Sequence, residues 1–272
     1  MKKIFLLISF IIFIYAENIE KEPIINSTNI IGDTVNMLKS KDPKSEYLLG
    51  IDLATSIIKD EIYPVNHKKV IYLKNILNNL VLSSETPYVF DGYKIILVKN
   101  NTINAFALPG GIIIIHDGLF NYLKNEDQFA AILGHEIGHI QEKHSIESNR
   151  SSLISDIAKV GAALTLVKKV ENNIIQNLAF GISSKITNSI ENGYNVDMEA
   201  AADAIGINIM YIAGYDPNEF LNLLNILKDN TNDYGGANYP EDRYIRLEKI
   251  IKTLKLENTK NEVRLRRYES IK

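Results

Sequence analysis

Three residues in one short stretch have the types and spacing of a metal-dependent hydrolytic site. His135 and His139 flank Glu136 in the pattern His-Glu-x-x-His. Residues four positions apart lie on the same face of an α-helix, so both imidazoles can bind one Zn²⁺. Glu136 lies beside them and can act as general base on a water molecule that the metal activates. The pattern therefore predicts a catalytic zinc site on a helix.

A catalytic zinc ion usually has three protein ligands, so a third ligand must come from elsewhere in the chain. The metzincin pattern would require Gly at position 142 and His at position 145, where this chain has Glu142 and Ser145. His144 is out of register with that pattern by one residue. We therefore expect the third ligand to be Glu199, which lies in an Ala-rich helical run. Asp203 lies one turn further on and could accept the second N–H of a ligating histidine.

The helix that carries the two histidines must begin near Glu126 and Asp127, whose charges suit the positive end of a helix dipole. Apolar residues then recur at helical spacing, at Phe129, Ala130, Leu133, Ile137 and Ile140. A glycine inside a helix costs about 1 kcal/mol relative to alanine, yet Gly134 and Gly138 lie four apart on one face. We interpret them as space for a close neighbour and expect a strand there. A mere weakness of the helix is the alternative.

The rest of the chain predicts helices around one short block of strands. Helical patterns cover about 43–84 and resume after Pro217 and Pro240. Strands are expected within 88–99, as a pair around Asp91-Gly92, and at 104–108 and 112–115, with a tight turn at 109–111. We therefore predict an α+β fold that is mainly helical, with a small antiparallel sheet beside the helix of the two histidines.

The composition indicates one globular domain and excludes several classes of protein. The chain has 272 residues, of which 46% are hydrophobic, and a formal net charge of −3. A nucleic-acid surface would need a clustered basic excess, which the sequence does not have. The chain has no cysteine, which excludes disulfides, a thiolate zinc site and a cysteine nucleophile.

The N-terminus has the pattern of an export signal. Lys2-Lys3 precede an apolar run that ends at Ala16, and this run is shorter than the ~20 residues that a membrane span needs. An uncleaved anchor or a buried helix is the alternative. We expect residues 1–16 to be a signal peptide, 17–42 a linker and 257–272 a charged, loose tail. The protein would then be exported, to the periplasm or the envelope.

Residues 154–180 form an apolar stretch between the two helices that carry the expected ligands. Lys168-Lys169 interrupt it, so it does not have the pattern of a transmembrane helix. One interpretation is a pair of helices that belongs to the core or to a lid. The other is a surface that makes a peripheral contact with lipid or with a membrane-protein substrate.

Four blocks of the sequence occur in an order that resembles one known family. They are Asn104–Gly111, then His135–His139 followed by His144, then Glu199–Gly206, and then Ala213–Pro217. Together they resemble the HtpX-like and CAAX-endopeptidase-like zinc metallopeptidases, a branch of the gluzincins. The nearest part of that family is the soluble periplasmic group around the beta-barrel assembly-enhancing protease. The resemblance spans about 45 to 250, which makes residues 43–256 a metallopeptidase domain of gluzincin type.

The resemblance implies roles for the matching residues. His135, His139 and Glu199 would hold one zinc ion per chain, with Glu136 as the base and Asp203 behind the ligands. An edge strand would pair with an extended polypeptide substrate through main-chain hydrogen bonds. The residues of that strand are Asn104, Ala105, Phe106, Ala107 and Leu108.

Two positions depart from the family pattern. Val196 replaces an arginine that is common three residues before the ligand Glu, and Tyr239 replaces a histidine that stabilises the transition-state oxyanion. Tyr239 could still donate a hydrogen bond, and Arg243 or Tyr194 could contribute. The oxyanion side of the site is therefore where this chain differs most from its relatives.

The sequence favours a zinc-dependent metalloendopeptidase that hydrolyses exported or envelope proteins, in protein quality control. Outer-membrane proteins or their assembly machinery would be partners. The alternative is a non-catalytic chaperone or assembly factor that binds extended strands in the same cleft. An integral membrane peptidase is a third hypothesis, against which the lack of a long apolar run argues.

Overall fold

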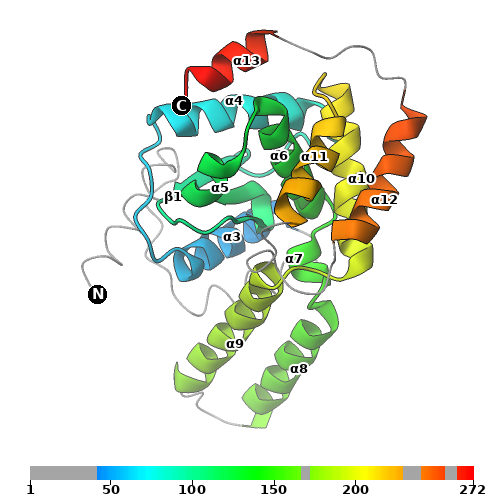
Figure 1. The fold of residues 1–272 in the computed structure, drawn as a ribbon. Helices are drawn as coiled ribbons and strands as arrows, with labels where there is room; N and C mark the ends of the chain where they lie inside the picture. The colour runs from blue at the N-terminus through cyan, green and yellow to red at the C-terminus, as the bar shows by residue number, and fades with distance from the viewer. Residues whose placement is uncertain (1–41, 167–171, 229–239, 255–261) are drawn as a thin grey trace.

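The computed structural model describes residues 42–166, 172–228, 240–254 and 262–272. The expected signal peptide, most of the expected linker and Tyr239 lie outside these ranges. The described helices are α3 (Pro43–Ile57), α4 (Lys68–Leu82), α5 (Asp117–Tyr122), α6 (Glu126–Gln141), α7 (His144–Glu147), α8 (Arg150–Leu166), α9 (Asn172–Glu191), α10 (Val196–Ile212), α11 (Asn218–Lys228), α12 (Pro240–Thr253) and α13 (Glu262–Glu269). The described strands are β1 (Lys94–Val98), β2 (Ala105–Leu108) and β3 (Ile112–His116). The expected α+β class, in which helices predominate, is confirmed (Figure 1).

The three strands form one mixed sheet in the order β1-β3-β2. β3 pairs in parallel with β1, where Lys94 lies opposite Ile112, and antiparallel with β2, where Ala105 lies opposite Ile115. The expectation of an antiparallel sheet is therefore wrong for the β1–β3 pair. β3 takes the central position because its run of isoleucines is buried on both faces, as a central strand requires.

The chain before β1 also differs from the pair of strands that the sequence suggested. Within residues 88–99, only Lys94–Val98 is a strand. Asp91 and Gly92 have φ angles of 58° and 72°, so they turn the chain just before β1 begins. The tight turn expected at 109–111 is present, as a 3₁₀ turn that joins β2 to β3.

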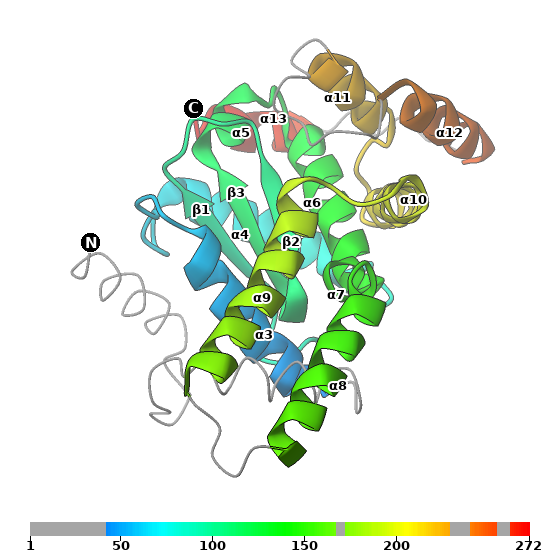
Figure 2. The same ribbon diagram turned by 90° about the horizontal axis from the view of Figure 1, so that it is seen from below.

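Alternate residues of each strand belong to two different cores, because successive side chains of a strand point to opposite faces. Ile95 and Ile113 pack with α4 and α6 on one face of the sheet. Ile96 and Phe106 pack with α3 and α9 on the other. The sheet therefore lies between two helical layers, and its edge strand β2 contacts both α6 and α9 (Figure 2).

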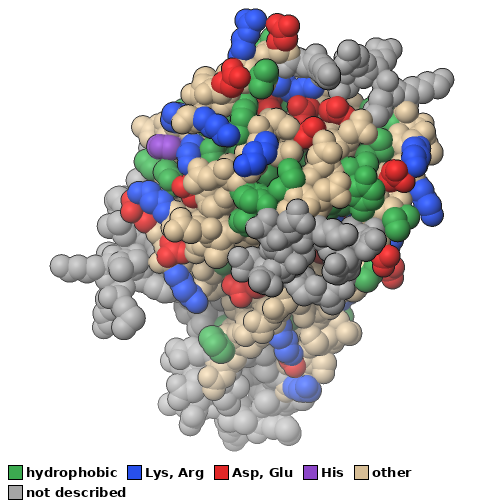
Figure 3. Space-filling view, viewed as in Figure 1, with side chains coloured by type: hydrophobic (Ala, Val, Ile, Leu, Met, Phe, Trp, Pro, Cys, Tyr) green, Lys and Arg blue, Asp and Glu red, His purple; other side chains and the backbone are tan. Residues whose placement is uncertain are grey.

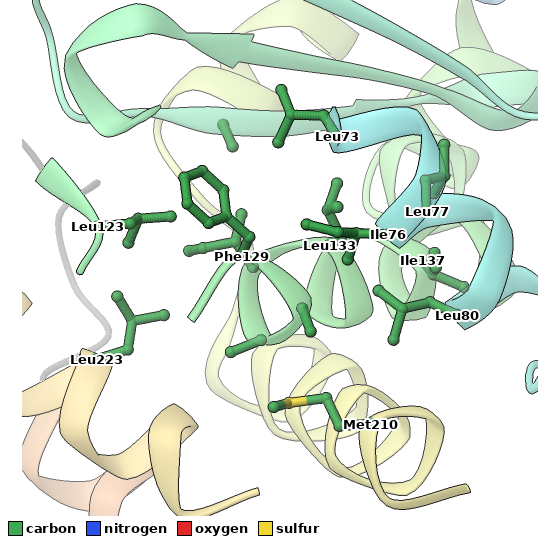
Figure 4. Close-up of a cluster of buried hydrophobic side chains, with 14 of the residues drawn as sticks. Leu73, Ile76, Leu77, Leu80, Leu123, Phe129, Leu133, Ile137, Met210 and Leu223 are labelled. Atoms are coloured by element: carbon green, nitrogen blue, oxygen red, sulfur yellow. The ribbon is translucent and has the colours of Figure 1, made fainter. Parts of the chain in front are cut away.

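Helix α6 passes through the larger of the two cores. Figure 4 shows its residues Phe129, Leu133 and Ile137 enclosed by side chains of neighbouring helices. These neighbours include Leu73, Ile76, Leu77, Leu80, Met210 and Leu223. Burial of each such side chain stabilises the fold by roughly 1.5–3 kcal/mol, so the helix that carries the two histidines is held firmly by packing.

Helices α6 and α10 approach each other along four small residues, Gly134, Gly138, Ala202 and Gly206, which we call the small-residue seam. A Cβ at Gly138 would lie 2.7 Å from the carbonyl oxygen of Ala202, and one at Gly206 would lie 2.9 Å from the backbone nitrogen of His135. Real Cβ atoms essentially never come closer than 3.0 Å to such atoms. The glycines of α6 therefore do provide space for a close neighbour. The prediction that this neighbour is a strand is wrong, because the neighbour is helix α10.

The apolar stretch 154–180 falls mainly in α8 and α9, which project together from the rest of the described structure (Figures 1 and 2). Ile182 is buried where α9 meets the sheet, whereas Ile154 and Phe180 are 49% and 75% exposed. None of the helices in the described ranges is long and apolar enough to cross a bilayer. A peripheral membrane contact through this stretch stays a prediction.

Charged side chains of both signs are interspersed over the face shown in Figure 3. Some of the ion pairs link elements that are distant in sequence, as Lys69 and Asp117 do at 2.5 Å. Interspersed charges of this kind do not create the large single-sign field that would steer a highly charged ligand.

The C-terminal segment 262–272 is charged, as expected, but the expectation that it is loose is wrong. It contains α13, which packs against the first turn of α6. Arg267 donates from Nε to the Glu126 carboxylate at 3.0 Å, and Arg264 donates from Nε to Asp127 at 3.2 Å. The Tyr268 hydroxyl is buried and donates to a backbone carbonyl at 2.9 Å. Periodicity alone did not indicate this contact, because it depends on residues far apart in the chain.

We expect Arg267→Ala to lower the free energy of unfolding by about 1–2 kcal/mol. Glu126 is 1% exposed, so loss of its partner would leave a buried carboxylate without compensation. The expected loss of stability is modest because the Arg267 side chain itself is 48% exposed. Urea unfolding measures the effect. The matched control is Arg266→Ala, which removes an exposed ion pair with Glu262 and should change stability by less than about 0.5 kcal/mol. Equal effects of the two variants would contradict the docking of α13.

Candidate metal centre

The two histidines of α6 point their Nε2 atoms toward one another. The Asn125 side chain caps α6 by accepting a hydrogen bond from the backbone N–H of Gln128 at 2.9 Å, which fixes where the helix begins. His135 and His139 are 7% and 5% exposed, and their Nε2 atoms are 2.9 Å apart. At this distance the two Nε2 atoms can share one hydrogen bond, or both can direct their lone pairs at a cation.

Glu199 reaches the same point from the first turn of α10. Asn195 caps that helix by accepting hydrogen bonds from the backbone N–H groups of residues 197 and 198. The backbone N–H of Tyr194 donates to Glu199 Oε1 at 3.1 Å and so orients the carboxylate. Glu199 Oε2 lies 3.4 Å from His135 Nε2, and Oε1 lies 3.8 Å from His139 Nε2. One ligand atom from each of the three residues lies within 4.8 Å of the other two.

Asp203 and Arg243 form a second layer behind His135. Asp203 Oδ1 lies 2.9 Å from His135 Nδ1, so it can accept that N–H and leave Nε2 as a lone-pair donor. Arg243, from α12, donates to both Asp203 oxygens, at 2.8 Å from Nε and 2.6 Å from Nη2. Asp203 thus lies beside His135, and the bidentate contact with Arg243 holds its carboxylate in place.

His144 supports the second histidine, a role that the sequence did not suggest. Its Nδ1 lies 2.8 Å from His139 Nδ1. Lys143 has a left-handed backbone conformation, with φ of 54°, and this turn brings His144 back toward α6. When His139 Nδ1 carries the proton and donates it to His144 Nδ1, Nε2 of His139 has a free lone pair and is available as a ligand. The sequence signal for this contact is the histidine that lies five residues after His139.

The charges at the site favour a bound cation. Although burial alone would raise the pKa of Glu199, hydrogen bonding and charge from His135 lower it to about 2. Burial likewise opposes ionisation of Asp203, but the Arg243 charge holds the pKa of Asp203 below its usual value. Burial would lower the pKa of His135, yet Asp203 and Glu199 raise it above its usual value. The two carboxylates therefore favour a positive charge at this point.

Two imidazole nitrogens and a carboxylate oxygen form the donor set that suits Zn²⁺, and the set is complete without cysteine. Each imidazole also has a polar atom close to Nδ1, as ligating histidines almost always do: Asp203 Oδ1 lies 2.9 Å from His135 Nδ1, and His144 Nδ1 lies 2.8 Å from His139 Nδ1. The residues present therefore fit a metal ion of this class. The structure brings together His135, His139 and Glu199, the three residues that the sequence proposed as ligands.

Glu136 lies at the cleft between α6 and the edge strand β2. Burial raises its pKa to about 7, although the neighbouring charge of His135 lowers it. The backbone N–H of Ala107 donates a hydrogen bond to the Glu136 carboxylate. A carboxyl group with a pKa near neutrality can both accept and return a proton, which is what a general base and acid must do.

The edge strand presents its backbone to this cleft. The His116 N–H donates to the Asn104 carbonyl at 3.0 Å, which makes these two residues a hydrogen-bonded pair of the antiparallel ladder. Such pairs alternate with non-bonded ones, so the backbone groups of Ala105 and Ala107 point away from β3. Of the predicted strand residues 104–108, the first four line the cleft, and the buried Leu108 does not.

Three residues were expected near the oxyanion of the transition state, and two of them, Arg243 and Tyr194, are among the described residues. Tyr239 lies outside the described residues. Arg243 lines the cleft, but its Nε and Nη2 atoms both donate to Asp203. Tyr194 also lines the cleft, its hydroxyl oxygen is buried, and its ring lies 4.6 Å from that of His139. Burial raises the pKa of Tyr194 well above its usual value, so the hydroxyl stays a hydrogen-bond donor.

Comparison with known proteins gives one family over most of the chain. Residues 68–260 match peptidase family M48. The beta-barrel assembly-enhancing protease of Yersinia pestis is 29% identical over 167 residues, which are 58% of this chain and 32% of that protein. The beta-barrel assembly-enhancing protease of Escherichia coli (strain K12) is 30% identical over 154 residues, or 54% of this chain and 29% of that protein.

A eukaryotic protein is also similar to this chain. The mitochondrial metalloendopeptidase OMA1 of Schizosaccharomyces pombe is 28% identical over 160 residues, which are 58% of this chain and 44% of that protein. The matches thus span about a third of the length of the two bacterial relatives and less than half of the yeast one. The family resemblance drawn from the sequence blocks is confirmed.

Proposed function

Because the chain belongs to peptidase family M48, we propose that it is a zinc-dependent metalloendopeptidase. One observation carries the proposal, which is the convergence of His135, His139 and Glu199 beside Glu136 in a cleft with an edge strand. A purely structural metal site would be closed and would have no use for a carboxylate with a raised pKa next to its ligands.

In this proposal the protein's residues divide the chemical work among them. A bound Zn²⁺ supplies Lewis acidity that activates water and polarises a peptide carbonyl. Glu136 takes a proton from the attacking water and passes it to the leaving amine. Asp203 and His144 hold His135 and His139 in the tautomers that leave Nε2 available. Because Arg243 is engaged with Asp203, we assign it to positioning and assign hydrogen bonding of the oxyanion to the Tyr194 hydroxyl.

The substrate in this proposal is an extended polypeptide segment. The outward backbone groups of Ala105 offer it main-chain hydrogen bonds, in the manner of an added strand. Such contacts give affinity with little dependence on side-chain sequence, which suits a protease that acts on misfolded chains. A non-catalytic chaperone could bind in the same cleft, but the combination of Glu136 with a complete ligand set favours hydrolysis.

The location and biological role are also proposals. The N-terminal pattern of residues 1–16 and the similarity to proteases named for beta-barrel assembly support an exported protein of the periplasm or envelope. We propose that it takes part in quality control of envelope proteins, with residues 43–256 as the metallopeptidase domain.

Metal removal tests the proposed function directly. We expect a chelator to lower casein cleavage by roughly 10³-fold or more, because the metal supplies the activation of water. Stoichiometric Zn²⁺ should restore cleavage, whereas Mg²⁺ should not, since it prefers oxygen ligands. Native mass spectrometry should find about one zinc ion per chain in the active form. Cleavage that resists chelation, or a purified chain that binds no zinc, would contradict the proposal.

A further inference from the structure

The mouth of the cleft carries one carboxylate that the proposed chemistry does not use. Glu191 is the last residue of α9 and lines the cleft together with Ile190 and Gly193. Gly193 has a φ of 78°, a left-handed conformation that ends the helix and turns the chain toward Tyr194. Ile190 is buried in the smaller core and anchors this helix end. Glu191 is therefore held at the cleft although its own side chain is exposed.

The charges deeper in the cleft compensate one another. A divalent metal ion and the Arg243 guanidinium would bring three positive charges. Glu199 and Asp203 bring two negative charges, and Glu136 is a third carboxyl group there, which exchanges a proton in the proposed reaction. Within the part of the chain that the structure describes, no hydrogen bond or ion pair joins the Glu191 side chain to another residue. Glu191 is thus a charge at the mouth of the cleft that has no ion-pair partner among the described residues.

The helix end adds to this negative potential. The C-terminal end of a helix carries a partial negative charge of roughly half an elementary charge, and Glu191 lies at that end of α9. Among the described residues that line the cleft, one is a Lys or Arg. This residue is Arg243, and its side chain is bound to Asp203. A substrate side chain that enters beside Glu191 therefore meets a negative field, and among the described residues that line the cleft no unpaired Lys or Arg competes with it.

We propose that Glu191 makes this cleft selective for polypeptides with a Lys or Arg side chain close to the scissile bond. The inference rests on the proposed peptidase function and names the class of substrate that this function would favour. The ion pair would form at the solvent-accessible mouth, so its effect is moderate and depends on salt.

The test uses short fluorescent peptides that differ only by Lys, Gln or Glu at one position, moved through the positions that flank the cleavage point. Both binding and cleavage are measured with the zinc-loaded protein. At the selected position we expect Lys to be preferred over Glu by about tenfold in kcat/KM and in affinity. The preference should shrink when NaCl is raised from about 0.05 M to about 0.5 M.

Two substitutions of Glu191 are then expected to change the charge preference in different ways. Glu191→Gln should abolish the preference, and Glu191→Lys should reverse it in favour of Glu peptides. The matched control is Glu85→Gln, which removes the charge of another exposed glutamate, one that does not line the cleft, and should leave the preference intact.

The outcomes separate this inference from the proposed function. Cleavage of all peptides without a charge preference, or a preference that survives Glu191→Gln, would overturn the role of Glu191 and leave the peptidase intact. Charge-selective binding without any cleavage would support Glu191 and contradict the peptidase. Neither binding nor cleavage of any peptide would reject both.

Discussion

Glu136→Gln is expected to lower kcat/KM for peptide cleavage by about 10²–10⁴-fold while the protein keeps its metal. Glutamine has nearly the same shape, and its amide oxygen can still accept the hydrogen bond from the Ala107 N–H. It cannot, however, take up and return a proton. The ligands His135, His139 and Glu199 are unchanged, so zinc content by mass spectrometry should match that of the wild type. Cleavage of casein and of the chain itself measures the loss.

The same variant separates the two functions that the sequence left open. If Glu136→Gln cleaves as fast as the wild type, Glu136 is not the base and the mechanism is wrong. If a deletion strain is rescued fully by the inactive variant, the biological role lies in strand binding rather than in hydrolysis. Circular dichroism and thermal unfolding of the variant should match the wild type, which excludes misfolding as the cause of lost activity.

The second large effect is expected from Gly138→Ala, at the small-residue seam. Helix propensity alone would favour alanine by about 1 kcal/mol. The new Cβ, however, would lie 2.7 Å from the Ala202 carbonyl oxygen and 2.8 Å from its Cα, and both atoms belong to backbone that cannot rotate away. Such overpacking costs about 1–3 kcal/mol or more, so we expect a net loss of about 1–2 kcal/mol in the free energy of unfolding.

Metal binding should suffer more than stability. Glu199 lies one turn before Ala202 on α10, so a displacement of α10 moves one ligand away from the two on α6. We expect the affinity for zinc to fall by at least about tenfold, measured by competition with a chelating dye.

Gly181→Ala provides the matched control, because it is the same substitution in helix α9, where a Cβ would meet nothing within 4 Å. Gly181→Ala should therefore stabilise the protein by up to about 1 kcal/mol and leave zinc affinity unchanged. If both variants stabilise the protein, the close contact between α6 and α10 is not as described.

The grouping of the candidate site residues could be predicted from the sequence because it follows helical spacing. His135 and His139 lie four residues apart, and so do Glu199 and Asp203, so one period relates each pair. The small size of Gly134 and Gly138 also indicated a close neighbour. The identity of that neighbour could not be predicted, because a glycine shows that space is needed and not what fills it.

What the sequence did not indicate depends on contacts between distant segments. β3 lies between β1 and β2 because its side chains are buried on both faces of the sheet. The order of the strands along the chain does not show this central position. His144 reaches His139 only because Lys143 adopts a left-handed conformation that is uncommon for lysine. Glu191 gave no signal in the sequence, since a glutamate at the end of a helix gains meaning only from the cleft beside it.

The contact between Arg267 and Glu126 also constrains the order in which the protein can mature. During synthesis the ribosome delivers residue 126 long before residue 267, so α6 first emerges without the cation that compensates its buried carboxylate. The first turn of the helix that carries the base and two ligands gains this ion pair only after residue 267 has been made. Of the described elements that pack against α6, α13 is the last to be made, so its contribution to the stability of that helix is added late.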